Sequence, residues 1–397
     1  MKPVYVVDAI RTPVGRYGGS LSTVRPDDLL ATVLRALHKR NETLDPAAIE
    51  EVIAGAANQA GEDNRNVARM ATLLAGLPIS VAGTTVNRLC ASGLQAIMDG
   101  ARQVAVGDAE LIMATGVESM SRAPYVMAKS AQPFDRSAQL FDTTMGWRFI
   151  NPSLAAQYYP FTMGETAENV AAHYAISREQ QDQFALSSQQ KYATAKASGC
   201  WEQEITAVEI QNKGLISWVV NDEHPRETSL EKLAALSPAF KKGGTVTAGN
   251  SSGINDGAAG LLLASESALR THKLTPIAKV VAMAVAGVDP AMMGIGPVPA
   301  PQKVLQRAGL TIKDIDLVEL NEAFASQSLA CMQELQLDPA RVNVNGGSIA
   351  IGHPLGCSGA RISTTLLYEL RRRKARFGLA TMCVGVGQGA AVIYEAL

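Results

Sequence analysis

The sequence predicts an α/β fold built from two copies of one supersecondary block, with a long insertion in the first copy. Strand-like apolar runs alternate with helical patterns near both ends of the chain, which is typical of mostly parallel sheets covered by helices. Several elements recur at an offset of about 265–273 residues, which indicates duplication. The segment between the copies is different, because Pro, Gln, Tyr and Trp are frequent there.

The recurring elements follow the same order in both copies. The matched pairs are the strands 4–7 and 277–282, the helices 29–39 and 302–308, the strands 49–53 and 315–320, the turn-and-helix segments starting at 90 and 356, and the strands 111–115 and 379–383. A strand over 84–87 leads into the first of these turns. We therefore expect two halves that fold alike.

The insertion is expected to form a loop domain on the scale of a lid. Ser177 and Gln180 have the spacing of a capping box and predict a helix over 177–198. The segment 243–247 is expected to be the strand that returns to the core. The expected division is 1–120 plus 247–272 for the first half, 121–246 for the loop domain and 273–397 for the second half. Long insertions on a rigid scaffold often hold substrate.

The bulk properties exclude several classes of function. The 397 residues are 47% hydrophobic and 18% charged, with a net charge of −1, which gives no broad attraction to nucleic acid or an anionic membrane. The one basic run, 371–374, fits a solvated helix end. No apolar stretch is long enough to span a bilayer, and Asp8 interrupts the apolar start. Five cysteines without close pairing favour a reducing, cytoplasmic setting over a disulfide scaffold or a zinc site.

Two cysteines and one histidine in glycine-rich surroundings are the candidate reactive groups. Cys90 follows a predicted strand and opens a helix, where the dipole and free N–H groups are expected to lower its pKa. His353, between Gly352 and Pro354, is presented from a rigid turn and can take a proton from a thiol. A second thiol at Cys383 can carry a proton. The alternatives are an inert buried cysteine and a core histidine bonded to backbone.

Two further features carry weaker signals. Asn321 follows a predicted strand, where its amide can orient water or cap a helix. The glycines from Gly385 to Gly389 lack the spacing of a dinucleotide loop, and only eight residues follow them. They fit backbone N–H groups turned toward a substrate oxygen beside Cys383.

Taken together, these segments resemble the thiolase family over essentially the whole chain. The motifs that carry the resemblance are Asn-Arg-Leu-Cys-Ala-Ser-Gly at 87–93, Asn-Glu-Ala-Phe-Ala at 321–325, Gly-His-Pro at 352–354 and Cys-Val-Gly at 383–385. The resemblance implies a layered helix–sheet–helix–sheet–helix core. It also implies CoA-dependent cleavage of a 3-ketoacyl-CoA to acetyl-CoA and a shortened acyl-CoA, in two half-reactions.

The resemblance also implies a role for each motif. Cys90, activated by His353, attacks the 3-keto carbon, and Cys383 protonates the departing enolate before coenzyme A takes the acyl group. The backbone N–H groups of Cys90 and Gly385 would form one oxyanion hole. His353 and a water held by Asn321 would form the other. Fixed donors are needed at both oxygens because charge develops at each.

Coenzyme A is expected as a co-substrate, with no tightly bound cofactor. The segment 249–253 matches the family's pantetheine-contacting loop and makes Ser252 and Ala248 candidates. Arg226 matches the arginine that contacts the adenine in the family, although Glu227 follows it directly where many relatives have proline. Phe240, Met163 and Phe324 match apolar positions along the substrate tunnel.

The substrate can be narrowed by resemblance. Short-chain biosynthetic thiolases usually carry histidine where Thr162 precedes Met163, so the chain resembles the degradative branch. The segments 61–70 and 141–149 resemble 3-oxoadipyl-CoA thiolases, and Arg148 is a candidate partner for a distal carboxylate. The alternatives are an acetoacetyl-CoA thiolase and a noncatalytic acyl-CoA-binding paralogue.

A decarboxylating condensing enzyme is a further alternative, but it would need a second histidine in place of Asn321. The family usually assembles as dimers or dimers of dimers, so a homodimer or homotetramer is expected, with acyl-CoA molecules as the partners.

Overall fold

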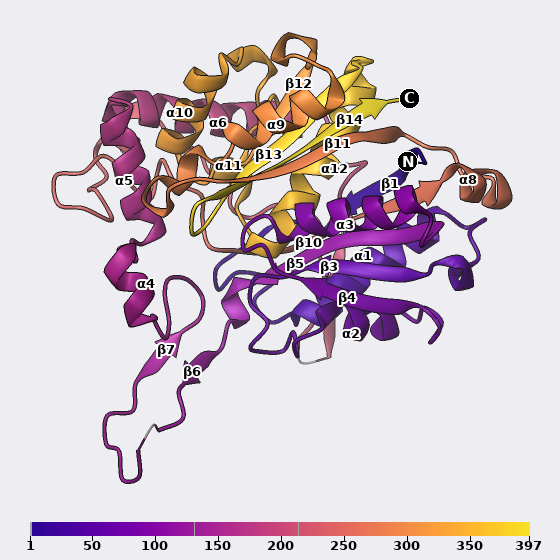
Figure 1. The fold of residues 1–397 in the computed structure, drawn as a ribbon, viewed down its shortest axis with the longest axis horizontal. Helices are drawn as coiled ribbons and strands as arrows, with labels where there is room; N and C mark the ends of the chain where they lie inside the picture. Colours follow the sequence, from indigo (N-terminus) through magenta and orange to yellow (C-terminus); the bar gives the residue numbers. More distant parts are fainter. Residues whose placement is uncertain (1, 131, 213) are drawn as a thin grey trace.

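The computed structural model describes residues 2–130, 132–212 and 214–397. Within these ranges a 10-stranded sheet has the strand order β12-β13-β14-β11-β1-β10-β5-β3-β4, and β2 pairs with β10 (Figure 1). The strands are β1 Val4–Arg11, β2 Gly15–Arg16, β3 Glu51–Gly55, β4 Ala82–Val86, β5 Leu111–Ser119, β10 Asn255–Ser265, β11 Ala278–Gly287, β12 Leu317–Leu320, β13 Phe377–Val384 and β14 Gln388–Ala396.

The pairing of the strands confirms the predicted duplication. In the first half β3 is parallel to β5, and β5, β10 and β1 follow antiparallel to one another. In the second half β12 is parallel to β13, and β13, β14 and β11 follow antiparallel. The halves join where β1 pairs with β11, at Tyr5↔Lys279 and Val6↔Ala278. The counterpart of β4 is reduced to a single bridge from Val318 to Val342.

Helices cover and separate the strands of the two halves in five layers. They are α1 Pro26–Arg40 and α2 Val67–Leu74 on the first half, α9 Pro299–Ala308 and α10 Ala325–Leu335 on the second, and α3 Ser92–Val106 and α12 Leu355–Arg373 between them. Figure 1 shows α3 and α12 between the indigo-to-purple strands and the orange-to-yellow strands. One buried apolar cluster joins these two helices to strands of both halves. The predicted α/β layering is therefore confirmed. The expectation of mostly parallel sheets is wrong, because, of the strand pairs in the described ranges, only β3–β4, β3–β5 and β12–β13 are parallel, while the long strands of each half follow one another antiparallel.

Glycines let α3 and α12 approach closely at their N-terminal ends. A Cβ built on Gly93 would lie 2.7 Å from the carbonyl oxygen of Gly356, and one on Gly359 would lie 2.1 Å from the amide nitrogen of Leu94. A side chain at either position would force the helices apart. Since Cys90 and His353 each precede one of these helix starts by a few residues, the packing brings the two segments to one place.

The segment between β5 and β10 contains the other large group of elements. They are β6 Tyr125–Met127, β7 Leu140–Asp142, α4 Pro152–Gln157, α5 Met163–His173, α6 Arg178–Ala197, β8 Val208–Asn212, β9 Leu215–Val219 and α7 Leu230–Ala234; the short helices α8 Glu266–His272 and α11 Ser348–Ile351 follow later. The predicted helix with the Ser177–Gln180 capping box is confirmed as α6. No helix in the described ranges is both long and apolar enough to cross a membrane.

The predicted strand at 243–247 is wrong. The returning strand is β10, which begins only at Asn255. The backbone N–H groups of Thr245 and Val246 instead donate to the carboxylate of Glu168 on α5, at 2.8–3.0 Å. A side chain from a distant helix thus satisfies the donors that a neighbouring strand would otherwise take.

Candidate active site

Cys90 lies in the turn between β4 and α3, and the turn is held in a strained conformation. Leu89 has a φ of 45°, which is unfavourable for a residue with a bulky side chain. The backbone N–H of Arg88 donates to the hydroxyl of Ser92 at 2.9 Å, and that hydroxyl donates to the carbonyl of Leu89 at 2.6 Å. The turn therefore presents the cysteine in a fixed position ahead of the helix.

Cys383 and Gly385 come from the other half and lie beside Cys90. Cys383 is near the end of β13, buried against Met163, Phe324 and other apolar side chains. The backbone N–H groups of Gly385 and of Cys90 itself act to lower the pKa of the Cys90 thiol, which indicates that they lie near its sulfur. Two backbone donors near this sulfur are available to stabilise the oxyanion that forms when Cys90 binds a carbonyl carbon.

The expected lowering of the Cys90 pKa is wrong. Burial raises the pKa of this thiol to about 11, and the donors from Gly385 and Cys90 offset only part of the effect. Burial also raises the pKa of Cys383 well above its usual value, with nearby Cys90 adding to the shift. The expectation considered only the helix N-terminus, which lowers the pKa of a thiol. Removal of the thiolate from water raises the pKa by more. Both cysteines therefore rest as thiols.

The imidazole of His353 is buried and neutral. Burial, followed by the positive charge of Arg361, lowers its pKa to about 3. Its Nδ1 lies 2.6 Å from the hydroxyl of Ser358, and that hydroxyl lies 2.8 Å from the carbonyl of Pro354. Because the carbonyl can only accept, the Ser358 hydrogen points to it and Nδ1 is the ring nitrogen that carries hydrogen. Nε2, which has no partner among the described residues, keeps a lone pair for a proton.

Asn321 lies directly after β12 and does not cap a helix. Its Oδ1 accepts a hydrogen bond of 2.6 Å from the hydroxyl of Ser348. Its Nδ2 is buried and has no partner among the residues that the structure describes. The N-cap of α10 is instead Phe324, so the helix-capping alternative is wrong. The free amide is a donor available to a water or a substrate oxygen.

The candidate residues for coenzyme A also lie together. Arg226 donates to the carbonyl of Ala248 at 2.8 Å, and both residues are exposed. Ser252 donates through its backbone and its hydroxyl to the carbonyl of Ala323, at 3.0 and 3.1 Å. These contacts join the 248–252 loop to the segment that contains Asn321.

Three apolar candidates connect this loop to the cysteines. The rings of Phe240 and Phe324 meet edge to face at 6.1 Å. Phe240 also covers Gly164, where any Cβ would collide with the ring. Met163 lies beside Gly385, since a Cβ on that glycine would be 3.5 Å from the methionine sulfur. These contacts connect Phe240 and Phe324 with Met163 and, through it, with Cys383 and Gly385.

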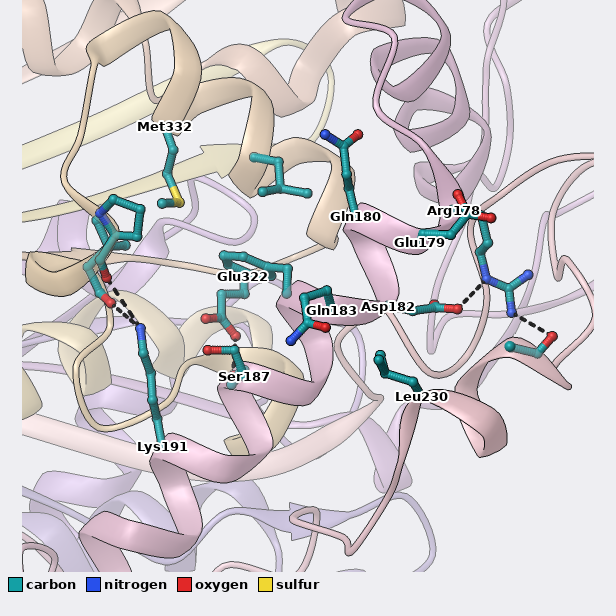
Figure 2. A pocket seen from close by; sticks show the side chains of 16 residues that line it. Arg178, Glu179, Gln180, Asp182, Gln183, Ser187, Lys191, Leu230, Glu322 and Met332 are labelled. Carbon is teal, nitrogen blue, oxygen red and sulfur yellow. Dashed lines mark hydrogen bonds and ion pairs between the residues drawn. The ribbon is translucent and has the colours of Figure 1, made fainter.

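None of the candidate catalytic residues lines a separate groove on the surface. It has a volume of about 780 Å³ and is lined mainly by α6, α7 and α10 (Figure 2). Three of its charged groups have partners: Arg178 pairs with Asp182 at 2.7 Å, and Lys191 donates to the carbonyl of Val342 at 2.9 Å. Glu322 accepts from Ser188 and from the backbone of Ile349. The size of this groove does not make it a site for the thiol chemistry.

Four residues that orient the site were not predicted from the sequence. Ser358 orients His353, and Asn255 accepts the backbone N–H of His353 at 2.9 Å. Ser348 holds Asn321, and Arg361 donates to Ser348 at 2.7 Å. Of the four, only Arg361 stands out in the sequence, because an arginine directly after a run of the small residues Gly, Cys, Ser and Ala is unusual. Among the described residues, no group of three or more His, Cys, Asp or Glu is arranged to hold a metal ion.

Comparison with known proteins agrees with this geometry. Residues 4–267 match the family described as "Thiolase, N-terminal domain", and residues 274–396 match "Thiolase, C-terminal domain". Among solved structures, the acetyl-CoA acetyltransferase of Bacillus anthracis has a TM-score of 0.94 at 42% identity and covers 100% of this chain and 99% of its own. Human mitochondrial 3-ketoacyl-CoA thiolase in complex with CoA has a TM-score of 0.93 at 42% identity, covering 100% and 98%.

Curated relatives match over the full length. The chain is 58% identical over 399 residues to the 3-oxoadipyl-CoA/3-oxo-5,6-dehydrosuberyl-CoA thiolase of Escherichia coli, with 100% of both chains covered. It is 56% identical to the beta-ketoadipyl-CoA thiolase of Pseudomonas aeruginosa, with 99% of both covered, and 48% identical to the acetyl-CoA acetyltransferase of Thiocystis violacea, also with 99% of both covered. The chain belongs to the thiolase family of acyltransferases.

Proposed function

We propose that this thiolase cleaves 3-oxoadipyl-CoA with coenzyme A, giving acetyl-CoA and a shortened acyl-CoA that keeps the distal carboxylate. The observation that carries the chemistry is that the backbone N–H groups of Gly385 and Cys90 both act to lower the pKa of the Cys90 thiol, which indicates that they lie near its sulfur. The names of the relatives from Escherichia coli and Pseudomonas aeruginosa support the choice of substrate.

In the first half-reaction the Cys90 sulfur attacks the 3-keto carbon while its proton passes to Nε2 of His353. The N–H groups of Cys90 and Gly385 stabilise the resulting oxyanion. The C2–C3 bond then breaks, and its electron pair moves to the enolate of acetyl-CoA. Nε2, now protonated, becomes a donor to the thioester oxygen together with the water that we assign to Asn321. The proton that His353 gains thus converts it from base to oxyanion donor.

Cys383 completes both halves of the reaction. Its thiol gives a proton to C2 of the enolate, which releases acetyl-CoA. The Cys383 thiolate then takes the proton of the incoming CoA thiol, and the CoA sulfur attacks the acyl group on Cys90. Cys90 leaves and regains its proton from His353. A thiol that is not ionised at rest fits this role, because it must first act as an acid.

Coenzyme A is assigned to the group formed by Arg226, Ala248 and Ser252, with Phe240, Met163 and Phe324 along the path to the cysteines. Coenzyme A is a co-substrate in this scheme and no resident cofactor is invoked. The free thiols of all five cysteines support a reducing, cytoplasmic setting. A homodimer or homotetramer belongs to the same proposal, as does the division into 1–120 plus 247–272, 121–246 and 273–397.

The distal carboxylate is assigned to Arg148. This half-buried arginine follows Trp147, whose indole N–H donates to the carbonyl of Phe161 at 2.9 Å. Phe161 lies two residues before Met163, which borders Gly385. The link ties the Arg148 segment to the start of α5 and supports a position near the acyl end of the substrate, where a guanidinium can bind a carboxylate in two places.

The chemistry is tested by trapping the acyl-enzyme. Incubated with 3-oxoadipyl-CoA and no free CoA, the wild-type protein should gain one acyl group on the peptide containing Cys90, detected by mass spectrometry. Cys383→Ser should still form an acyl adduct on Cys90 when it is given a simple acyl-CoA thioester, because that transfer breaks no carbon–carbon bond and forms no enolate. His353→Ala should form the adduct slowly. An adduct on another cysteine would contradict the assignment of the nucleophile.

The substrate is tested by selectivity. Arg148→Ala should lower kcat/KM for 3-oxoadipyl-CoA about 10-fold to 100-fold relative to acetoacetyl-CoA, because an ion pair of this kind is worth about 1.5–3 kcal/mol. Arg136→Ala, in an exposed part of the same insertion, is the matched control and should leave the ratio unchanged. An unchanged ratio in Arg148→Ala would reject the carboxylate role.

The second candidate function is that of an acetoacetyl-CoA thiolase. It is favoured by the 48% identity to an acetyl-CoA acetyltransferase, and it predicts that Arg148→Ala leaves the ratio of the two kcat/KM values unchanged.

A further inference from the structure

A buried arginine lies behind the candidate site without any assigned part in the reaction. Arg361 on α12 is fully buried, as are Ser348 in α11 and Asn321 after β12. One Nη of Arg361 lies 2.7 Å from the Ser348 hydroxyl, which in turn lies 2.6 Å from Oδ1 of Asn321. Glu319, the other partner of the guanidinium, is at the longer distance of 3.4 Å. The short bonds therefore run from Arg361 to Asn321.

The direction of each hydrogen bond in this chain follows from the chemistry of the groups. A guanidinium has donors and no acceptor, so the Ser348 oxygen must accept from Arg361. The single hydrogen of that hydroxyl is then free to point at Asn321. The atom of Asn321 that receives it must be the carbonyl oxygen, because an amide NH₂ cannot accept. The orientation of the Asn321 amide is thus determined by Arg361, two bonds away.

This orientation turns the amide nitrogen of Asn321 to the opposite side. Nδ2 is buried there with no partner among the described residues, as is Nε2 of His353. A reversed amide would present an oxygen where the proposed reaction develops negative charge, and would leave Ser348 facing a donor. We propose that Arg361, through Ser348, is a positioning residue that keeps the Asn321 amide nitrogen directed at the second oxyanion site.

Electrostatics at the same position support this role. The positive charge of Arg361 is the second cause, after burial, of the low pKa of His353. Burial raises the pKa of Glu319 to about 8 in spite of Arg361, so this carboxyl only partly neutralises the guanidinium near pH 7. The charge thus lies behind both groups assigned to the second oxyanion site. We call the two hydrogen bonds from Arg361 through Ser348 to Asn321 the relay. The relay rests on the proposed role of Asn321 as a donor.

A double-mutant cycle tests the relay. Ser348→Ala should lower kcat about 10-fold with KM changed less than twofold, because the amide donor is lost only when the transition state forms. Asn321→Ala should lower kcat about 100-fold, as loss of an oxyanion donor does. In the Asn321→Ala background, Ser348→Ala should have no further effect on kcat, because its action passes through the amide.

Two further variants separate positioning from a structural role. Ser363→Ala removes an equally buried hydroxyl of the same helix that holds Arg361, bonded to Gly359 and Tyr394, and should leave kcat within twofold. Ser348→Cys keeps the volume and a weak donor and should recover part of the activity. Equal thermal unfolding temperatures of Ser348→Ala and Ser363→Ala would exclude a general loss of stability.

The outcomes distinguish the relay from the function beneath it. If Asn321→Ala keeps wild-type kcat, the assignment of Asn321 to the oxyanion site fails, and the relay fails with it. If Asn321→Ala is slow while Ser348→Ala is fully active, or if the two effects multiply in the double variant, the relay alone is overturned. The predicted pattern, a slow Ser348→Ala with no added effect in the double variant, supports both.

Discussion

His353 and Ser358 share a hydrogen bond of 2.6 Å between Nδ1 and Oγ at the start of α12. The serine hydrogen is directed at the carbonyl of Pro354, 2.8 Å away, so the histidine donates from Nδ1. The ring therefore presents a lone pair at Nε2, which has no partner among the described residues. The backbone of the turn and the serine together determine which nitrogen can react.

Removing the serine hydroxyl should release this tautomer. Ser358→Ala should lower kcat about 10-fold or more, because a histidine in the wrong tautomer cannot accept the thiol proton. Thr364→Val, which removes a buried hydroxyl bonded to Ala360 of the same helix, is the control and should be nearly neutral. The ¹⁵N shifts of the His353 ring should show a protonated Nδ1 in the wild type. A protonated Nε2 would contradict the account.

The resting state of Cys90 can be tested by alkylation. Because burial raises the pKa of this thiol to about 11, its reaction with iodoacetamide should increase about tenfold per pH unit from pH 7 to 9, without a plateau. Peptide mapping identifies the modified residue, and Cys90→Ala gives the background. A plateau near pH 7 would indicate a thiolate at rest and would restore the opposite expectation from the helix terminus.

Sequence patterns predicted the fold well where the signal is local or repeated. The capping box at Ser177 located the start of α6, and the fixed offset between copies anticipated equivalent strand pairing. They failed where a distant group decides the outcome. The segment at 243–247 has strand-like residues, but Glu168 binds its backbone. The Cys90 turn has a helix terminus, but burial determines the pKa.

The candidate site shows the same division. Cys90, His353, Cys383 and Asn321 stand in recognisable motifs, so the sequence could identify them. Ser348, Ser358 and Arg361 act only through partners 5 to 27 positions away in the chain, at His353, Ser348 and Asn321. Nothing in their local sequence distinguishes such serines from those that pack inside any helix. Their roles become visible only when hydrogen-bond directions are traced in three dimensions.

Gly385 must stay without a side chain. A methyl group there would lie 3.2 Å from Cδ1 of Leu89 and 3.5 Å from the sulfur of Met163. Gly385→Ala should therefore fold and yet lose about 10-fold to 100-fold in kcat/KM, because a small displacement of the oxyanion donor is costly. Gly287→Ala, whose new methyl would meet only a carbonyl 4.0 Å away, is the control. Full activity in Gly385→Ala would contradict the tight fit.

Val386 is strained next to this glycine. Its φ of 62° is rare for a β-branched residue, and the side chain is 40% exposed. Val386→Gly should raise the free energy of unfolding by about 1 kcal/mol, since the left-handed conformation costs about 1–2 kcal/mol for a residue with a Cβ. Val281→Gly, at a partly exposed position in β11, should instead destabilise. Urea unfolding measures both, and destabilisation by Val386→Gly would refute the strain.

The carboxyl of Glu118 should make stability depend on pH. Burial raises its pKa to about 7, although the N–H groups of Ala57, Asn58 and Gly356 bind it. Between about pH 4.5 and 7 the folded state then binds more protons than the unfolded state, so this group's contribution to stability falls as pH rises. Relative to the wild type, Glu118→Gln should gain up to about 1.4 kcal/mol per pH unit in that window and no more above it. A flat difference would contradict the raised pKa.

Cys90 is proposed to perform thiolysis on a 3-ketoacyl-CoA with a distal carboxylate. The direct measurement compares CoA-dependent cleavage of 3-oxoadipyl-CoA, acetoacetyl-CoA and a longer straight-chain 3-ketoacyl-CoA, with Cys90→Ala as the control. We predict the highest kcat/KM for 3-oxoadipyl-CoA and no cleavage by the variant. Preference for acetoacetyl-CoA or the longer chain would contradict the substrate, and intact substrates or an active Cys90→Ala variant would contradict the mechanism.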